Sequence, residues 1–251
     1  MKDSQNIDIE IASLARRYRM ATGSGLQLMN LLGGQVEGLI DNLPTALRDQ
    51  LGSATEAALH IALDAASGSR KAVPDQVGWL NTVVATAMGA AGGFGGITSS
   101  LVELPVTTTI LLRAIQGVSV EQGFDPDLES VRFDCIKVIG SAGPLSHDDG
   151  ADLGFLSARL ALSGANVQRL IVTIAPRLAT ALGQKLAAQT IPVLGAIAGA
   201  ATNYVYINYY QEMAFVQFRL RRLALEENVP YEDLLEDLAY QLGQPAIAPH
   251  L

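Results

Sequence analysis

The chain is poor in several residue types, and each shortage excludes a class of protein. A single cysteine, Cys135, cannot form an internal disulfide framework or a cysteine zinc site. Lysine occurs only four times, and 17 basic against 25 acidic residues give a net charge of −8, so binding to a nucleic acid backbone is not expected. Charged residues make up only 17% of the chain and hydrophobic residues 49%, which excludes a disordered protein because there is ample apolar surface to bury.

Motifs of known chemistry are also missing. A phosphate-binding P-loop requires a lysine after its glycines, and the glycine cluster at residues 89–96 has none nearby. The Gly-x-Ser-x-Gly elbow of a serine hydrolase does not occur either. The three histidines, His60, His147 and His250, are too scattered for a zinc hydrolase or a Ser-His-Asp triad. We therefore expect neither a cofactor nor a bound metal, with the His-Asp-Asp triplet at residues 147–149 as the metal alternative.

The N-terminus does not resemble a secretory signal. Acidic residues at positions 3, 8 and 10 precede the arginines, whereas a signal begins with positive charge and continues into an apolar run. We expect a cytoplasmic location, with peripheral attachment to the inner face of the membrane as an option.

Two long stretches lack charged side chains. No charged residue stands between Asp75 and Glu103, and none between Lys185 and Glu212. Each stretch exceeds the ~20 residues that a helix needs to cross a bilayer, but glycine pairs, threonine, proline or asparagine interrupt both, and leucine, isoleucine and phenylalanine are sparse. Two interpretations stay open: buried core helices in a soluble bundle, which are apolar on all sides, or segments that insert into a membrane.

Helical spacing dominates between the prolines, and strand-like alternation is nearly absent. We predict an all-α, single-domain bundle of eight to ten helices with two glycine-rich apolar helical segments at its centre. Within residues 1–251 the N-terminal helices occupy about 1–72, the first apolar segment 73–140, the second half 150–243 and a loose tail 244–251. The helices are predicted at residues 7–20, 25–39, 44–66, 77–91, 97–122, 126–140, 153–163, 166–189, 192–227 and 230–243.

Small residues recur at helix-packing distances in both apolar segments. Glycines four residues apart allow two helix backbones to approach closely. We predict that the two segments cross at the centre of the molecule through Gly89, Gly92, Gly93, Gly96, Gly195 and Gly199.

A few polar side chains interrupt the apolar segments. Glu103, Arg113 and Glu212 each interrupt or end an uncharged run, and a charge among so much apolar surface must pair, reach water or become neutral. The plainer interpretation is structural, with Arg113 paired to Glu212 and Glu103 at a helix break facing solvent. The other is a functional polar site that includes one helix face of the second segment, formed by Asn203, Tyr206 and Tyr210.

A group of arginines lies at the end of the second segment. Arg219, Arg221 and Arg222 are typical of a solvated helix face, and contact with anionic lipid is the alternative. These three residues are therefore the candidates for lipid contact.

The apolar segments and their flanks resemble a known family. The central signature of the EcsC protein family is similar to the run GGFGGITSSLVELPVTTTILLRAIQGVSVEQGFDP followed by ESVRFDCIKVIG: a glycine cluster, an acidic-Leu-Pro turn, an arginine-bearing helix and a Gly-Phe-Asp that opens the next helix. Its second signature resembles KLAAQTIPVLGAIAGAATNYVYINYYQEMAFVQFRLRRL. The resemblance covers most of the chain. It implies a bacterial protein related to one encoded beside an ABC transporter, with no agreed catalytic residues, although some members carry a hydrolase label.

These features together predict a function of the EcsC type. We expect a non-enzymatic helical accessory or interaction protein that associates with a membrane, with membrane lipid or a membrane protein as its partner. The outer amphipathic helices would shield the apolar segments in solution and open to let them meet lipid. Two alternatives remain: a hydrolase that uses carboxylates such as Glu103 or Glu212, and a soluble carrier of an apolar small ligand.

Overall fold

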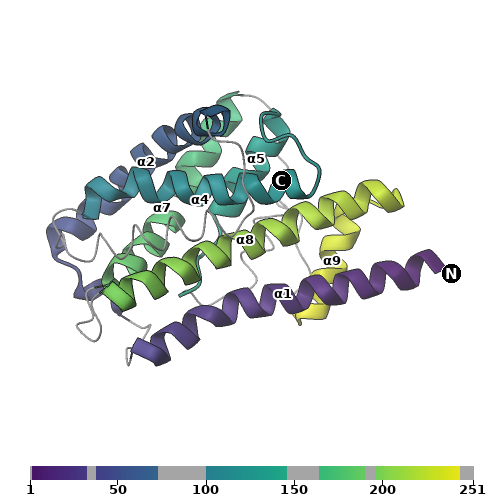
Figure 1. Ribbon diagram of the computed structural model, residues 1–251, viewed down its shortest axis with the longest axis horizontal. Helices are drawn as coiled ribbons and strands as arrows, with labels where there is room; N and C mark the ends of the chain where they lie inside the picture. Colours follow the sequence, from purple (N-terminus) through teal and green to yellow (C-terminus); the bar gives the residue numbers. More distant parts are fainter. Residues whose placement is uncertain (1, 33–37, 73–99, 146–163, 190–195, 244–251) are drawn as a thin grey trace.

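The computed structural model describes residues 2–32, 38–72, 100–145, 164–189 and 196–243 (Figure 1). Within these ranges it contains seven α-helices, one short 3-10 helix and no strand, which confirms the predicted all-α class. The helices pack around a common apolar core. They are α1 (Lys2–Leu32), the 3-10 helix η1 (Leu39–Asn42), α2 (Thr45–Ala72), α4 (Ser100–Glu121), α5 (Glu129–Ile139), α7 (Gly164–Gln189), α8 (Ala196–Glu227) and α9 (Tyr231–Leu242).

Helix α8 is the centre of the bundle. It contacts α1, α4, α5, α7 and α9, and Figure 1 shows it running between α4 and α1. The aromatic run TNYVYINYY lies inside this helix, as predicted from its helical neighbours, although its residue types favour strands. A helix that is covered on several sides has apolar side chains on all of those sides and not in one stripe. This explains why the apolar side chains of α8 are distributed around the helix.

The first two predicted helices form one continuous helix. We expected an end near residue 20 and a new start at Gly25, but α1 passes through Gly23 and Gly25 without interruption. The hydroxyl groups of Thr22 and Ser24 donate to the carbonyls of Tyr18 and Ala21, at 3.1 and 2.6 Å, so these polar side chains are satisfied within the helix. The two glycines therefore do not end the helix, and Gly25 allows α1 to approach the backbone of Pro144 closely.

The sequence predicts a buried stripe in α2 from apolar residues at spacings of three and four, which are Leu47, Leu51, Ala54, Ala58, Ile61 and Ala65. The structure confirms this stripe in part. Leu47, Leu51 and Ala58 are buried as expected, but Ile61 is 54% exposed. Helix α2 packs on α7, where Leu51 lies against Gly183, and also on α4. Because α4 and α7 lie on different sides of α2, the buried face changes along the helix. A single apolar stripe at spacings of three and four residues does not describe that change.

The break expected beside Glu103 does not occur. Helix α4 continues through Pro105, the sixth residue of the helix. A proline removes only one backbone donor, and near the start of a helix few hydrogen bonds are lost. The hydroxyl of Thr109 donates to the carbonyl of Pro105 at 2.7 Å, which adds a local bond in this turn.

The later helices lie close to their predicted positions. Helix α5 begins at Glu129, because the Asp125 carboxylate accepts the backbone N–H of Asp127 at 2.9 Å and holds a turn ahead of it. Helix α7 passes through Pro176. Helix α9 begins after Pro230 and ends at Gly243, whose φ of 73° is the left-handed conformation that glycine favours.

Several predictions fall outside the described residues. They are the helices at 77–91 and 153–163, the triplet at residues 147–149, His250 and the crossing residues Gly89, Gly92, Gly93, Gly96 and Gly195. Gly199 lies in α8 and is buried, and α8 packs on α4, so the described parts of the two segments are neighbours. The crossing through glycine stays a prediction. Among the helices that the structure describes, none has both the length and the apolar character needed to cross a membrane.

Candidate functional site: the polar side chains of helix α8

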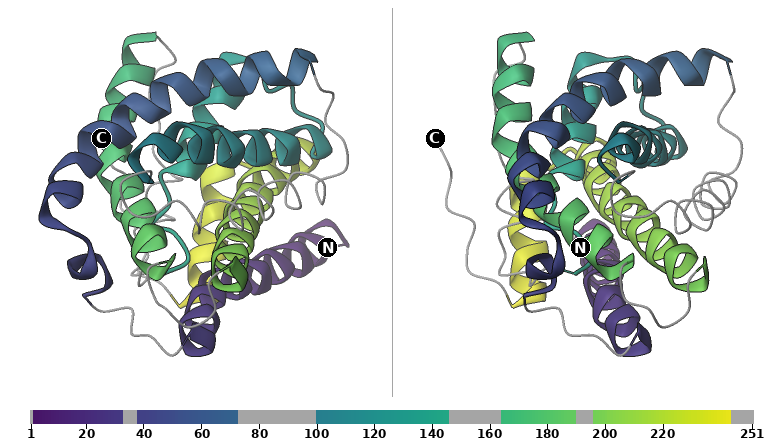
Figure 2. Two further views of the ribbon diagram at one scale, coloured as in Figure 1. Left: turned by 60° about the vertical axis from the view of Figure 1, so that its left-hand side comes forward. Right: turned by 90° about the vertical axis from the view of Figure 1, so that its left-hand side faces the viewer.

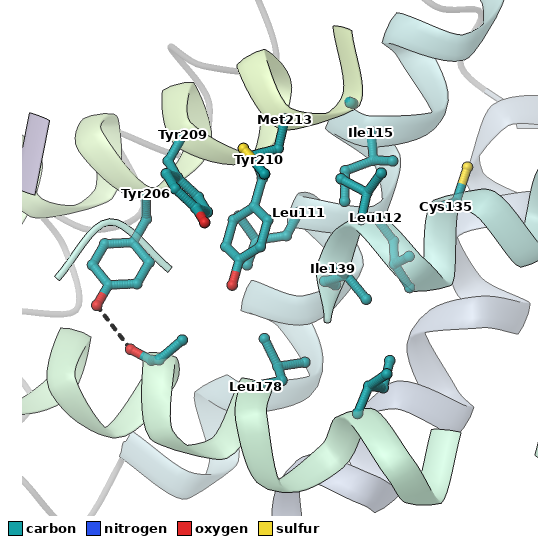
Figure 3. Packing of buried hydrophobic residues seen from close by; sticks show 14 of the residues in the cluster. Leu111, Leu112, Ile115, Cys135, Ile139, Leu178, Tyr206, Tyr209, Tyr210 and Met213 are labelled. Atoms are coloured by element: carbon teal, nitrogen blue, oxygen red, sulfur yellow. Dashed lines mark hydrogen bonds between the residues drawn. The ribbon is translucent and has the colours of Figure 1, made fainter. Parts of the chain in front are cut away.

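Three tyrosines of α8 are fully buried in the core. Tyr206, Tyr209 and Tyr210 each have an exposed fraction of 0%, and the rings of Tyr209 and Tyr210 meet edge to face with centroids 5.1 Å apart. Figure 3 shows Tyr206 and Tyr210 extending from α8 toward α7. Both belong to the predicted helix face, and its third member, Asn203, is also buried.

The hydroxyl groups of these tyrosines reach backbone carbonyls. Tyr206 donates to the carbonyl of Ala181 in α7 at 2.8 Å, and Tyr210 approaches the carbonyl of Ser141, just after α5, at 3.4 Å. Ser141 and Gly143 belong to a buried turn. Gly143 has a φ of 89°, and a Cβ added there would lie 2.8 Å from the Cβ of Ala181. The tyrosines therefore tie α8 to α7 and to the turn that leaves α5.

Removing the Tyr206 hydroxyl tests this bond. We expect Tyr206→Phe to lower the free energy of unfolding by about 1 kcal/mol at neutral pH, because a buried hydrogen bond is lost. Burial, with a smaller repulsion from Tyr210, raises the pKa of Tyr206 well above its ordinary value of 10.0. Above pH 10 an unfolded tyrosine thus releases a proton that the folded one keeps, and the stability contributed by Tyr206 is lost as pH rises.

Urea unfolding at neutral and alkaline pH measures both effects. The stability difference between the wild type and Tyr206→Phe should shrink above pH 10 and reverse as the pH rises further. The control is Tyr240→Phe, since Tyr240 is 85% exposed and removing its hydroxyl should leave the stability at neutral pH unchanged. A difference that stays constant through this pH range would contradict the burial argument.

Glu212 lies on another side of α8 and faces α1. It forms a salt bridge with Arg17 at 2.8 Å, and the Arg17 guanidinium also lies over the Phe215 ring at 3.8 Å. We expected Arg113 of α4 as the partner, but the salt bridge shown at Glu212 is with Arg17. Glu212 is two positions after Tyr210, or about 200° around a helix, so their side chains leave in nearly opposite directions. Arg113 is half-buried in α4 and Glu103 lies within the same helix.

The three arginines near the end of α8 have partners within the protein. Arg219 binds Glu10 of α1 at 3.2 Å and Glu226 at 2.9 Å, and Arg222 binds Glu226 at 2.6 Å. The hydrogen bond from Arg222, with that from Arg219, lowers the pKa of Glu226. Arg221 binds Asp134 of α5 at 2.5 Å. Lipid contact by these arginines stays a prediction, and their observed contacts join α8 to its neighbours.

A buried charge cluster between α5 and α8 was not predicted. The Asp134 carboxylate binds Lys137 at 3.1 Å and also Arg221, and the side chains of Asp134 and Lys137 are only 11% and 7% exposed. Arg221 also donates to the Ser130 hydroxyl at 3.2 Å and lies over the Phe124 ring at 4.8 Å. The sequence signal is an acid and a lysine three residues apart among apolar residues in FDCIKVI, a spacing that places both on one helix face.

A second polar contact lies close to this cluster. Tyr231, at the start of α9, donates to the Gln217 side chain of α8 at 2.6 Å. Burial, followed by the charge of Asp134, raises the pKa of Tyr231 far above its ordinary value, so this hydroxyl stays protonated. Helix α9 is therefore attached to α8 by a hydrogen bond between neutral side chains. This bond lies beside the ion pair of Asp134 and Arg221, which joins α5 to α8.

The arrangement is that of a structural polar network. The carboxylates of Asp134, Glu212 and Glu226 are each held by an arginine. Within the described ranges, no group of three histidine, cysteine, aspartate or glutamate residues lies close enough to hold a metal ion. Cys135 is buried in α5.

Comparison with known proteins agrees with the sequence resemblance. The model of the EcsC protein family matches residues 69–223, which include α4, α5, α7 and most of α8. "Uncharacterized protein YdbA" of Bacillus subtilis (strain 168) is 24% identical over 159 residues, or 60% of this chain. The chain spans 57% of that relative's length. No solved structure matches the chain. The family match includes Asp134, Tyr206 and Arg221, whereas Glu10 and Arg17 of α1 lie outside it.

Proposed function

The chain belongs to the EcsC protein family, and on that premise we propose that it is a non-enzymatic accessory protein that associates with a membrane. Its partner is membrane lipid or a membrane protein, such as a component of an ABC transport system. The observation that carries the proposal is the stretch without charged residues between Asp75 and Glu103, which leads directly into α4. A stretch of this length and composition can lie against a bilayer at little electrostatic cost.

The packing of α8 supports an accessory role over a catalytic one. Its charged side chains join helices: Glu212 and Arg219 hold α1, and Arg221 holds α5. A hydrolase that used Glu212 as a general acid or base would need that carboxylate free of its partner, and Arg17 lies 2.8 Å away. The hydrolase and the carrier of an apolar ligand have no comparable observation in their favour.

The bundle also suggests how the apolar segments are shielded. Helix α1 covers α8 and is held there by ion pairs of Arg17 and Arg219, while the Arg19 guanidinium donates to the Gln241 carbonyl of α9. Ion pairs at a surface are weak and respond to salt and to nearby charge. In this proposal α1 and α9 cover the second apolar segment in solution and move aside at a membrane.

Co-sedimentation with vesicles tests the proposal. The full chain is mixed with phosphatidylcholine vesicles, with and without phosphatidylglycerol, and the bound fraction is measured after centrifugation. We expect binding to at least one of these vesicles. If the protein stays in the supernatant with both, at low and at physiological salt, membrane association is wrong.

A further inference from the structure

Helix α7 differs in charge from the rest of this acidic protein. The chain has a net charge of −8, yet α7 contains Arg169, Arg177 and Lys185 and no aspartate or glutamate. Each of the other α-helices in the described ranges contains at least two acidic residues. A helix surface without carboxylates on an acidic protein is a place where an anionic partner meets less repulsion.

One face of α7 is exposed between residues 168 and 180, and residues 181–188, toward the C-terminal end of the helix, are mostly buried. The opposite face packs into the core through Leu170, Ile174 and Leu178, which are nearly fully buried. The exposed side chains follow helical spacing, and Val172 is 57% exposed. These side chains are Gln168, Arg169, Val172, Thr173, Pro176 and Thr180. Both views of Figure 2 show the first turns of α7 at the upper edge of the bundle, beyond the neighbouring helices.

The exposed face of α7 is also easy to dehydrate. The hydroxyl of Thr173 donates to the Arg169 carbonyl at 2.9 Å, and that of Thr180 to the Pro176 carbonyl at 3.1 Å. Hydroxyl groups that bond within their own helix lose little when water leaves the surface. Arg169 is exposed, and no salt bridge holds it among the described residues. The face therefore combines a cation with Val172 and Pro176, as helices at a membrane interface do.

We propose that the exposed face of α7 is the surface that contacts anionic lipid headgroups. Arg169 would bind a lipid phosphate while Val172 and Pro176 meet the apolar part of the interface. This inference rests on the proposed membrane association and adds to it a surface and a lipid charge. It places lipid contact on α7, since Arg219, Arg221 and Arg222 are already paired with carboxylates of this chain.

Charge reversal on α7 tests the surface. The double variant Arg169→Glu/Thr173→Glu should bind vesicles of phosphatidylcholine and phosphatidylglycerol about tenfold more weakly than the wild type, because repulsion replaces attraction. The control variant is Arg16→Glu/Ser53→Glu, which changes the net charge equally. Arg16 is exposed on α1 and Ser53 is exposed on α2. Like Thr173, Ser53 donates its hydroxyl to a carbonyl of its own helix, that of Gln50. The control should bind like the wild type.

A gain of binding provides the second test. Thr180→Lys adds a cation to the exposed face of α7 and should strengthen binding to the same vesicles, whereas Ser53→Lys should not. Wild-type binding should also weaken as salt screens the charges. Circular dichroism establishes that each variant is folded.

The outcomes separate this inference from the proposed function. If the wild type binds no vesicle, membrane association itself is wrong, and the α7 surface is wrong with it. If the wild type binds but the α7 and control variants bind equally, the membrane association stands and the α7 surface is overturned. Equal wild-type binding with and without phosphatidylglycerol likewise overturns the lipid charge.

Discussion

Replacing Gly25 with alanine is expected to lower the free energy of unfolding by about 3 kcal/mol. An added Cβ at Gly25 would lie 1.8 Å from the carbonyl oxygen of Pro144 and 2.4 Å from its carbonyl carbon. These are backbone atoms of a buried turn, so no flexible side chain can move aside, and either α1 or the turn must shift. Urea denaturation followed by circular dichroism measures the loss.

Gly23 is a matched control two residues earlier in the same helix. A Cβ at Gly23 meets no atom within 4 Å. Gly23→Ala should therefore stabilise the protein by about 0.5–1 kcal/mol, because alanine favours a helix over glycine. Two alanine variants of equal stability would show that the close approach of α1 to Pro144 is wrong.

Removing the Asp134 carboxylate is expected to cost about 3 kcal/mol of unfolding free energy, at the lower end of the usual range for a broken buried ion pair. Asp134 is the carboxylate that Lys137 and Arg221 share, and the Lys137 side chain is only 7% exposed. In Asp134→Ala the two cations remain close together without that counter charge. Urea denaturation of the wild type and the variant measures the loss.

Two further variants establish the cause. Asp41→Ala breaks the exposed pair with Arg48, in which the Asp41 side chain is 75% exposed, and should change stability by less than about 1 kcal/mol. Asp134→Leu/Lys137→Met replaces the buried pair by apolar groups and should recover part of the loss. A loss of stability as small for Asp134→Ala as for Asp41→Ala would mean that the cluster is not a buried ionic contact.

The predicted functional site divides into two in the structure. Sequence spacing placed Asn203, Tyr206 and Tyr210 on one helix face, and the structure buries all three. It did not indicate the salt-bridge partner of Glu212, which is Arg17 of α1, a helix far away in sequence. Spacing along one helix fixes directions around its axis and contains no information about the neighbour in each direction.

The buried cluster of Asp134, Lys137 and Arg221 was missed for a related reason. Charged residues are rarely fully buried, so a lysine in a helix is normally expected at the surface. Here the Asp134 carboxylate compensates the charge of Lys137 within α5, and Arg221 reaches from α8 to the same carboxylate. The i, i+3 spacing in FDCIKVI was visible, but the third partner was not.

The sequence alone determined the local features of this protein. Helix type, the course of α8 through its aromatic run, and the start and end of α9 follow from backbone propensity, capping and apolar spacing, which act over a few residues. The tertiary structure decided the rest: the continuity of α1 past Gly25, the partner of Glu212 and the exposed, acid-free face of α7. Each depends on which helices become neighbours, and that choice is made by packing the whole core at once.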